Sequence, residues 1–253
     1  MATPLKDIVN FTDQFLSVNK VDDYCPNGLQ VEGCAEVSKI VGGVTASQAL
    51  IDQAIKHKAS AILVHHGYFW KGENPVVTGI KKKRLKSLLE NDISLLAYHL
   101  PLDMHPEIGN NAQLAKNLGF EVTGPLEPLA SRSIGLAGKL LHTKTARELQ
   151  TLISEKLGRP CQHIGDPDEK IETVAWCTGA AQGMIENACA LGVDAYLSGE
   201  ISEPTVHIAR ETGIHYFSAG HHATERDGVR ALGQLLASKF QVEFEFIDID
   251  NPV

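Results

Sequence analysis

The stretch from Lys39 to Val64, KIVGGVTASQALIDQAIKHKASAILV, decides the fold, because it recurs from Thr173 to Ser198 as TVAWCTGAAQGMIENACALGVDAYLS. The two segments align without a gap at an offset of 134 residues. The identical pairs at this offset include Gln48 and Gln182, Ala54 and Ala188, and Ala61 and Ala195. Each copy carries two apolar runs on either side of a helical pattern, which predicts a strand, a turn of small residues, a helix and a second strand.

The first copy shows where these elements should begin and end. Its first apolar run, Ile40-Val41, ends at Gly42-Gly43, where we expect the strand to stop. A helix should follow with Thr45 or Ser47 as its N-cap, and the next strand should cover Ala61 to Val64. A strand, a helix and a strand in this order form a βαβ unit, which implies a parallel sheet.

A second correspondence follows at an offset of 122 residues, where His99-Leu-Pro-Leu-Asp103 aligns with His221-His-Ala-Thr-Glu225. Both segments have the pattern His-x-x-x-carboxylate, and both follow an apolar run, Leu95–Tyr98 or Tyr216–Ala219. The smaller offset means that the first copy has about twelve more residues, which we place between residues 71 and 94. The same two motifs therefore occur twice in the same order.

These repeats predict an α/β protein with two similar lobes, built from βαβ units around mixed or parallel sheets and arising from an internal duplication. Chance similarity of two βαβ units is the alternative, but the shared order of two motifs favours duplication. The best boundary is the stretch from Gly124 to Ser131, which is rich in proline and small residues, so residues 1–127 would form the first lobe and residues 128–253 the second. Residues 241–249 alternate apolar and polar side chains, which predicts a closing strand.

Composition excludes several classes of protein. A chain of 253 residues with 43% hydrophobic and 21% charged residues is typical of globular proteins. The N-terminus does not look like a signal peptide, and no apolar run reaches the length of about 20 residues that spans a membrane, so we expect a cytosolic protein without membrane contact. The five cysteines form no CxxC pair, so we expect reduced thiols. The net charge of -8 argues against nonspecific nucleic-acid binding, and we interpret the basic cluster Lys81–Arg84 as the solvated face of a helix.

Five of the eleven histidines lie at the predicted carboxyl ends of strands, where open α/β sheets bind ligands. They are His65, His66, His99, His221 and His222. Adjacent strand residues point to opposite faces, so the imidazoles of His65 and His66 should converge only if the strand has already ended before Gly67. Taken alone, this pair is more often two interior histidines than two metal ligands.

Two carboxylates accompany these histidines. Asp103 follows a strand by a short proline-containing turn, and Glu225 lies four residues after His221 at the start of a predicted helix, residues 223–238, so that both can face one point. Imidazoles and carboxylates without sulfur suit Zn, Mn, Fe or Ni, and the sequence does not rank these metals. Together the clusters predict a centre of two divalent metal ions per chain, located between the two lobes.

Three further features have alternative interpretations. We place His99 and His222 beside the metal ligands, where they would orient ligands or move protons in catalysis, although either could bind a metal directly. Glu200 occupies the position equivalent to His66 at the offset of 134, but an exposed loop glutamate is its simpler interpretation. Gly42-Gly43 could hold a phosphate, although a structural turn is favoured.

Four strings carry a resemblance to a known family. They are Pro26-Asn-Gly-Leu-Gln-Val-Glu-Gly33, His65-His-Gly-Tyr-Phe-Trp-Lys-Gly72, His99-Leu-Pro-Leu-Asp103 and Gly220-His-His-Ala-Thr-Glu225. The chain resembles, over nearly its whole length, the Nif-three-like dinuclear metal family, often labelled GTP cyclohydrolase I type 2. The resemblance implies two α/β lobes, a toroidal homohexamer, and a two-metal site with His65, His66, Asp103, His221 and Glu225 as its ligands.

The expected function is that of a metal-dependent hydrolase. Two neighbouring cations activate a water molecule and stabilise the charge that develops on the attacked carbon or phosphorus. The family label suggests a purine nucleotide as substrate, as in GTP cyclohydrolase chemistry. The alternative is a non-enzymatic toroid that carries metal or binds a partner protein or nucleic acid, with DNA disfavoured by the negative net charge.

Overall fold

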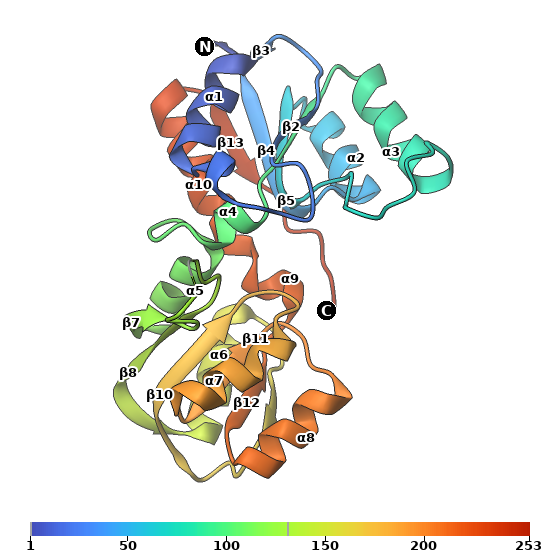
Figure 1. Ribbon diagram of the computed structural model, residues 1–253. Helices are drawn as coiled ribbons and strands as arrows, with labels where there is room; N and C mark the ends of the chain where they lie inside the picture. Colours follow the sequence, from blue (N-terminus) through green and yellow to red (C-terminus); the bar gives the residue numbers. More distant parts are fainter. Residues whose placement is uncertain (1, 131) are drawn as a thin grey trace. The chain divides into compact units, whose positions relative to one another are not determined.

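The computed structural model describes residues 2–130 and 132–253, so Met1 and Ser131, the last residue of the expected boundary, lie outside the described residues. The chain forms two compact units, each with its own sheet (Figure 1). The first unit contains Met1–Ile108 and Gly228–Asp250, and the second contains Gly109–Asp227 and Asn251–Val253. Each unit is an α/β structure, which confirms the predicted fold class of two similar lobes.

The first unit is built on a five-stranded sheet with the order β13-β4-β5-β6-β2. The strands are β2 (Gly28–Val31), β4 (Lys39–Thr45), β5 (Ala61–His66), β6 (Ser94–Ala97) and β13 (Glu243–Phe246). Strands β13, β4, β5 and β6 are parallel, and β2 pairs antiparallel with β6 at the edge. The small pair β1 (Thr3–Pro4) and β3 (Glu36–Val37) and the 3-10 turn η1 (Val18–Lys20) complete its short elements.

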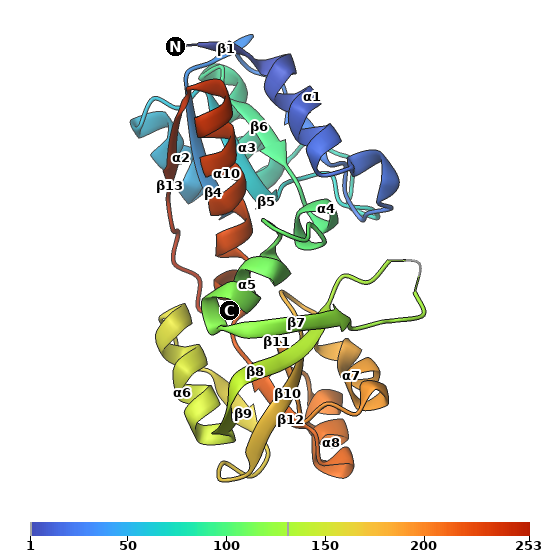
Figure 2. The same cartoon turned by 90° about the vertical axis from the view of Figure 1, so that its left-hand side faces the viewer.

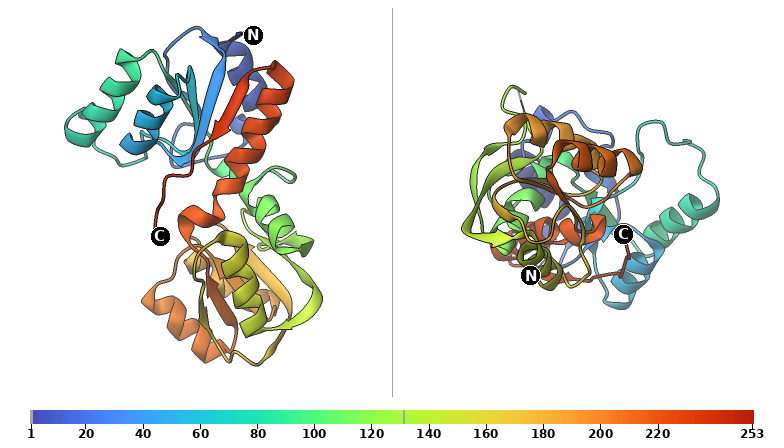
Figure 3. Two further views of the ribbon diagram at one scale, coloured as in Figure 1. Left: turned by 180° about the vertical axis from the view of Figure 1, so that it is seen from behind. Right: turned by 90° about the horizontal axis from the view of Figure 1, so that it is seen from below.

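Helices cover both faces of this sheet, with α1 and α10 on one side and α2 and α3 on the other (Figure 1 and Figure 3). Their bounds are α1 (Leu5–Phe15), α2 (Gln48–Lys56), α3 (Gly79–Glu90), α4 (Leu100–Asp103) and α10 (Arg226–Phe240). Successive strand residues point to opposite faces, so Leu63 packs with α1 and α10, whereas its neighbours Ile62 and Val64 pack with α2 and α3. Burial on both faces explains why the central strands are almost entirely apolar.

The second unit is built on a six-stranded sheet with the order β7-β8-β10-β11-β12-β9. The strands are β7 (Phe120–Pro125), β8 (Leu136–Thr145), β9 (Gln162–Ile164), β10 (Lys170–Cys177), β11 (Ala195–Ser198) and β12 (His215–Ser218). The helical elements are α5 (Asn110–Leu118), α6 (Ala146–Leu157), η2 (Gln182–Met184), α7 (Ile185–Leu191), α8 (Glu203–Thr212) and α9 (His221–Thr224). Helices α5 and α6 pack on one face and α7 and α8 on the other (Figure 2).

The two sheets share a core of three parallel strands with the same register. Ile40 pairs with Ala61 in the first unit, and Val174 pairs with Ala195 in the second, so both partners are shifted by the offset of 134 that the sequence repeat defines. The third strand keeps this likeness, since β6 continues the parallel core of the first unit and β12 that of the second. The common register supports the inferred duplication.

The observed boundary differs from the one expected at residues 127 and 128. The first unit ends at Ile108, because β7 pairs antiparallel with β8 and so belongs to the second sheet. The closing strand forms as expected, but it pairs in parallel with β4, and the preceding α10 packs against the same sheet. The C-terminal segment Gly228–Asp250 therefore returns to the first unit, and residues 128–253 do not form one lobe.

Two local expectations also need correction. The first strand does not stop at Gly42-Gly43 but continues to Thr45, and both glycines are buried within it. An added Cβ at Gly42 would lie 2.7 Å from the Phe244 ring and one at Gly43 would lie 2.6 Å from Leu50, so both glycines allow close packing and do not form a phosphate loop. The expected cap is present, since the Ser47 side chain accepts a hydrogen bond from Leu50 N–H.

Candidate metal centre

His65 and His66 are the last two residues of β5, so the strand continues through both of them rather than ending before them. Their rings are nevertheless neighbours, with centroids 4.6 Å apart, although successive residues of a regular strand point to opposite faces. His65 is fully buried, and His66, which is partly exposed, forms a hydrogen bond of 3.1 Å between its Nδ1 and Thr45 Oγ1. The pair thus presents two imidazoles at the carboxyl end of the sheet.

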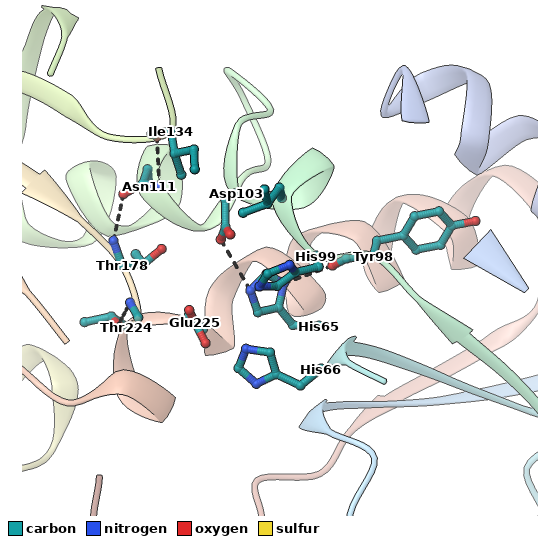
Figure 4. Close-up of polar contacts among 12 residues, drawn as sticks. His65, His66, Tyr98, His99, Asp103, Asn111, Ile134, Thr178, Thr224 and Glu225 are labelled. Carbon is teal, nitrogen blue, oxygen red and sulfur yellow. Dashed lines mark hydrogen bonds and ion pairs between the residues drawn. The ribbon is translucent and has the colours of Figure 1, made fainter. Parts of the chain in front are cut away.

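The tautomer of His65 is fixed by the backbone (Figure 4). Its Nδ1 donates a hydrogen bond of 2.9 Å to the carbonyl oxygen of Tyr98, and its Nε2 lies 3.5 Å from Asp103 Oδ1. Asp103 is the last residue of the short helix α4 and is only 5% exposed. In His65, Nδ1 donates to a backbone acceptor and Nε2 faces a buried carboxylate. This arrangement is common among metal-binding histidines.

His99 lies against the same histidines, with its ring centroid 5.0 Å from that of His65 and 5.7 Å from that of His66. The three side chains offer ligand nitrogens within 4.8 Å of one another, so they form a group able to hold a metal ion. His99 therefore lies beside His65 and His66, and its role beside the candidate ligands stays a prediction.

A carboxylate that sequence reasoning missed orients His99. Asp23 Oδ1 accepts a hydrogen bond of 2.7 Å from His99 Nδ1, and Oδ2 accepts from the Leu100 N–H and the Asn27 side chain. Burial alone would raise the pKa of Asp23, but these hydrogen bonds and the charge of His99 lower it to about 2. Asp23 is therefore an ionised acceptor that leaves Nε2 of His99 available on the other side of the ring.

In the second unit, His221 lies between two carboxylates. Its Nδ1 donates to Glu200 Oε1 at 2.7 Å, and its Nε2 lies 3.1 Å from Glu225 Oε2. Burial would lower the pKa of His221, but the hydrogen bonds and charges of Glu225 and Glu200 raise it to about 9. Glu200 is thus only partly exposed and bonded to a candidate ligand, so its interpretation as an exposed loop glutamate is wrong.

Gly179 leaves room for the carboxylate of Glu225. The expected helix from residue 223 to 238 is interrupted at Glu225, which caps α9 and precedes α10. Gly179 has a φ of +71°, and an added Cβ there would lie 2.2 Å from Glu225 Oε1. Its N–H donates to Thr224 Oγ1, so the loop after β10 closely follows the end of α9 (Figure 4). Any larger residue at this position would displace the carboxylate.

His222 differs from the other candidates. It is buried, and its backbone N–H donates to the Val253 carbonyl oxygen. Within residues 2–130 and 132–253, it belongs to none of the groups of side chains able to hold a metal ion. Its expected catalytic role stays a prediction.

Comparison with known proteins identifies the family once this geometry is known. Residues 3–252 match the family described as Duf34/NIF3 (NGG1p interacting factor 3). The chain belongs to the Duf34/NIF3 family. This confirms the resemblance to the Nif-three-like family that the sequence motifs carry.

Relatives of this Duf34/NIF3 chain cover its whole length. It is 58% identical to a Pseudomonas aeruginosa protein named GTP cyclohydrolase 1 type 2 homolog, with 100% of each chain covered, and 51% identical to an Escherichia coli K12 protein of the same name, with 99% of this chain and 98% of the relative covered. It also resembles the solved structure of protein ybgI, described as of unknown function, with a TM-score of 0.95, 50% identity, and 99% and 100% coverage. A protein from Thermus thermophilus gives a TM-score of 0.89 at 29% identity, with 99% and 100% coverage.

The described parts of this Duf34/NIF3 chain contain clusters of His, Asp and Glu that can bind metal, in agreement with the predicted class of site. No helix within the described residues has the length and apolar character needed to cross a membrane. The sequence indicated most of the candidate ligands, because they follow strands in two matching motifs. It missed Asp23, which lies in a loop just before the Pro26–Gly33 string and shows no periodic pattern.

Proposed function

We propose that His65, His66, Asp103, His221 and Glu225 bind two divalent metal ions, and that the centre is that of a hydrolase acting on a nucleotide. One observation carries this proposal: the Nδ1 atoms of His65 and His221 each donate to an oxygen acceptor, and the Nε2 atom of each faces a buried carboxylate. This is the donor arrangement expected of metal-binding histidines. A nucleotide substrate is suggested by relatives named GTP cyclohydrolase 1 type 2 homolog.

The donor set fits hard or borderline divalent cations. It combines neutral imidazoles with carboxylates and contains no sulfur, which suits Zn, Mn, Fe or Ni. His221 must lose a proton to bind a cation, since neighbouring carboxylates raise its pKa to about 9. We therefore expect metal uptake to release protons and to become stronger as the pH rises toward 9.

Two bound cations would supply an activated water and would stabilise negative charge on the attacked group. Among the residues of the chain, His99 is suited to move a proton, because Asp23 accepts from its Nδ1 and thereby fixes the tautomer. Asp23 is in this view a positioning residue for His99. We also propose a proton-transfer role for His222, on the basis of its sequence position next to His221.

The test combines metal analysis with turnover. Purified wild-type protein should contain two equivalents of divalent metal, and His65→Ala should contain fewer, as measured by elemental mass spectrometry. A panel of purine and pyrimidine nucleotides should reveal metal-dependent hydrolysis that is lost in His65→Ala. His142→Ala, at an exposed histidine of the second unit, is the matched control and should leave metal content and turnover unchanged.

The outcomes separate this proposal from its alternative. Fewer than two metal equivalents would count against the two-metal centre. Full metal content without turnover on any nucleotide would favour a non-enzymatic role, such as metal transport or the binding of a partner. We further propose a cytosolic location and a toroidal homohexamer, which gel filtration with light scattering would test by giving six times the chain mass of 27.4 kDa.

A further inference from the structure

Two aromatic side chains lie beside His99 in the first unit. The Trp70 ring centroid is 5.0 Å from that of His99 at an interplanar angle of 89°, and the Tyr24 ring centroid is 6.4 Å from it at 60°. Trp70 also lies 6.0 Å from the His66 ring. The contact with His99 is perpendicular and not stacked, and the indole of Trp70 stays partly exposed.

The exposure of these rings is unusual for the chain. Tyr24 is 61% exposed and Trp70 is partly exposed, whereas the other tryptophan, Trp176, is fully buried. Large aromatic rings in contact with solvent commonly mark binding surfaces, because they offer a rigid apolar face at low entropic cost. The neighbouring imidazoles of His66 and His99 add polar atoms next to this apolar face.

The backbone holds both rings in place. Phe69 adopts a φ of +65°, a left-handed conformation that is strained for a bulky residue and that persists only where surrounding contacts enforce it. The Lys71 N–H donates to the Tyr24 carbonyl oxygen, which ties the two aromatic segments together, and the Trp70 N–H donates to Glu73. The aromatic pair is therefore a built feature of two loops and not the chance exposure of single side chains.

We propose that Trp70 is a stacking platform for the planar heteroaromatic ring of a purine nucleotide, with Tyr24 at its border. A stacked purine would lie next to His99, whose Nδ1 bonds Asp23 and whose Nε2 can form a hydrogen bond with a ring atom. The exposed Lys71, directly after Trp70, provides a cation near the platform for the phosphate group. This inference rests on the proposed function for the choice of a nucleotide, but the stacking surface itself needs no bound metal.

The chain carries its own reporter for the test, since Trp70 is its one solvent-exposed tryptophan among the described residues. Chelator-treated protein is titrated with guanosine 5′-monophosphate, and ribose 5-phosphate serves as the ligand without a ring. Saturable quenching of tryptophan fluorescence is expected with the first ligand only. The signal should disappear in Trp70→Phe, which removes the reporter.

Affinity is then measured by equilibrium dialysis, which does not depend on tryptophan. Trp70→Ala should weaken binding of guanosine 5′-monophosphate by about fivefold to a hundredfold, the range found for the loss of one base–aromatic stack. Trp70→Phe retains a ring and should stay within about threefold of the wild type. Leu129→Ala, at a fully exposed apolar residue of the second unit, is the control and should have no effect.

The proposal is overturned if Trp70→Ala binds the nucleotide as tightly as the wild type, or if ribose 5-phosphate competes equally well. Failure of the metal-centre proposal gives a different pattern. Saturable quenching by the purine in a protein that never acquires two metals would support the stacking site and refute the two-metal hydrolase. Two bound metals without purine-dependent quenching would do the reverse.

Discussion

Replacing Glu200 by Gln should weaken divalent metal binding and should do so in a pH-dependent way. Glu200 accepts a hydrogen bond of 2.7 Å from His221 Nδ1, and both side chains are about one third exposed or less. Outer carboxylates that orient ligating histidines contribute about 10- to 100-fold to metal affinity, or about 1.4 to 2.7 kcal/mol. Glutamine can still accept from Nδ1, but it lacks the charge that makes the imidazole a stronger ligand.

A second effect of the same substitution has the opposite sign at neutral pH. The pKa of His221 is raised to about 9, so at pH 7 a proton competes with the metal by a factor on the order of 100. Removing the Glu200 charge lowers this pKa and reduces the competition. The loss of affinity should therefore be partly masked at pH 7 and should approach its full size near pH 9.

The assay is competition with a metal-buffering chelator at pH 7 and pH 9, for the wild type and Glu200→Gln. Glu203→Gln is a matched control, because Glu203 also binds a histidine, His207, at 3.2 Å, but both side chains are more than half exposed. The control should bind metal as the wild type does at both pH values. Equal affinities of wild type and Glu200→Gln at pH 9, or a greater loss at pH 7 than at pH 9, would refute the role assigned to Glu200.

Two further predictions concern a glycine and a histidine of the second unit. Gly179→Ala should lower metal content, measured by elemental analysis, and should reduce the free energy of unfolding, measured with urea, more than Gly192→Ala does. Both glycines have φ near +70°, but only at Gly179 would a Cβ meet Glu225. The control Gly192→Ala should cost only the left-handed penalty of about 1 to 2 kcal/mol. Burial and the adjacent His215 lower the pKa of His163 to about 4, below its unfolded value, so protons bind the unfolded chain more readily as the pH falls from 6.5 to 4. The free energy of unfolding should fall across this window by about 1 to 2 kcal/mol, once solvent screening of the half-exposed ring is allowed for. His163→Gln should show a smaller fall. An equal fall in both proteins would contradict the assignment of this pH dependence to His163.

Local patterns in the sequence were enough to predict the parallel strands, because buried strands must be continuously apolar and a repeated pattern repeats its register. They were not enough to predict the division into units. Strand β13 pairs with β4, with Phe244 opposite Ile40, and α10 packs on the same sheet through Val229 and Leu232, so their partners lie far away in the sequence. The sequence of an amphipathic helix or a strand does not indicate which of two similar sheets it joins. The predicted boundary at residue 127 rested on local composition, so it did not foresee that residues 228–250 rejoin the first unit.

The contacts of the candidate ligands show a similar limit, with one exception. Asp23 reaches His99 across 76 positions of sequence, and no spacing rule links a loop carboxylate to a histidine that far away. Glu200 was different, because the offset of 134 placed it opposite His66 and so at the end of a strand. The repeat thus located it correctly, whereas its bond to His221 depends on where the next strand and helix bring that ring.

The repeat also explains why the two units hold their candidate ligands differently. At the offset of 134, Thr45 and His65 of the first unit correspond to Gly179 and Gly199 of the second. A Cβ at Gly199 would lie 2.6 Å from the Cα of His221, so the loss of a side chain there lets the start of α9 approach the strand end. Gly179 makes room for the following carboxylate in the same way. In the first unit the strand itself supplies histidines. In the second unit glycines at the strand ends leave space, which is taken by His221 of α9 and by Glu225, the C-cap of α9.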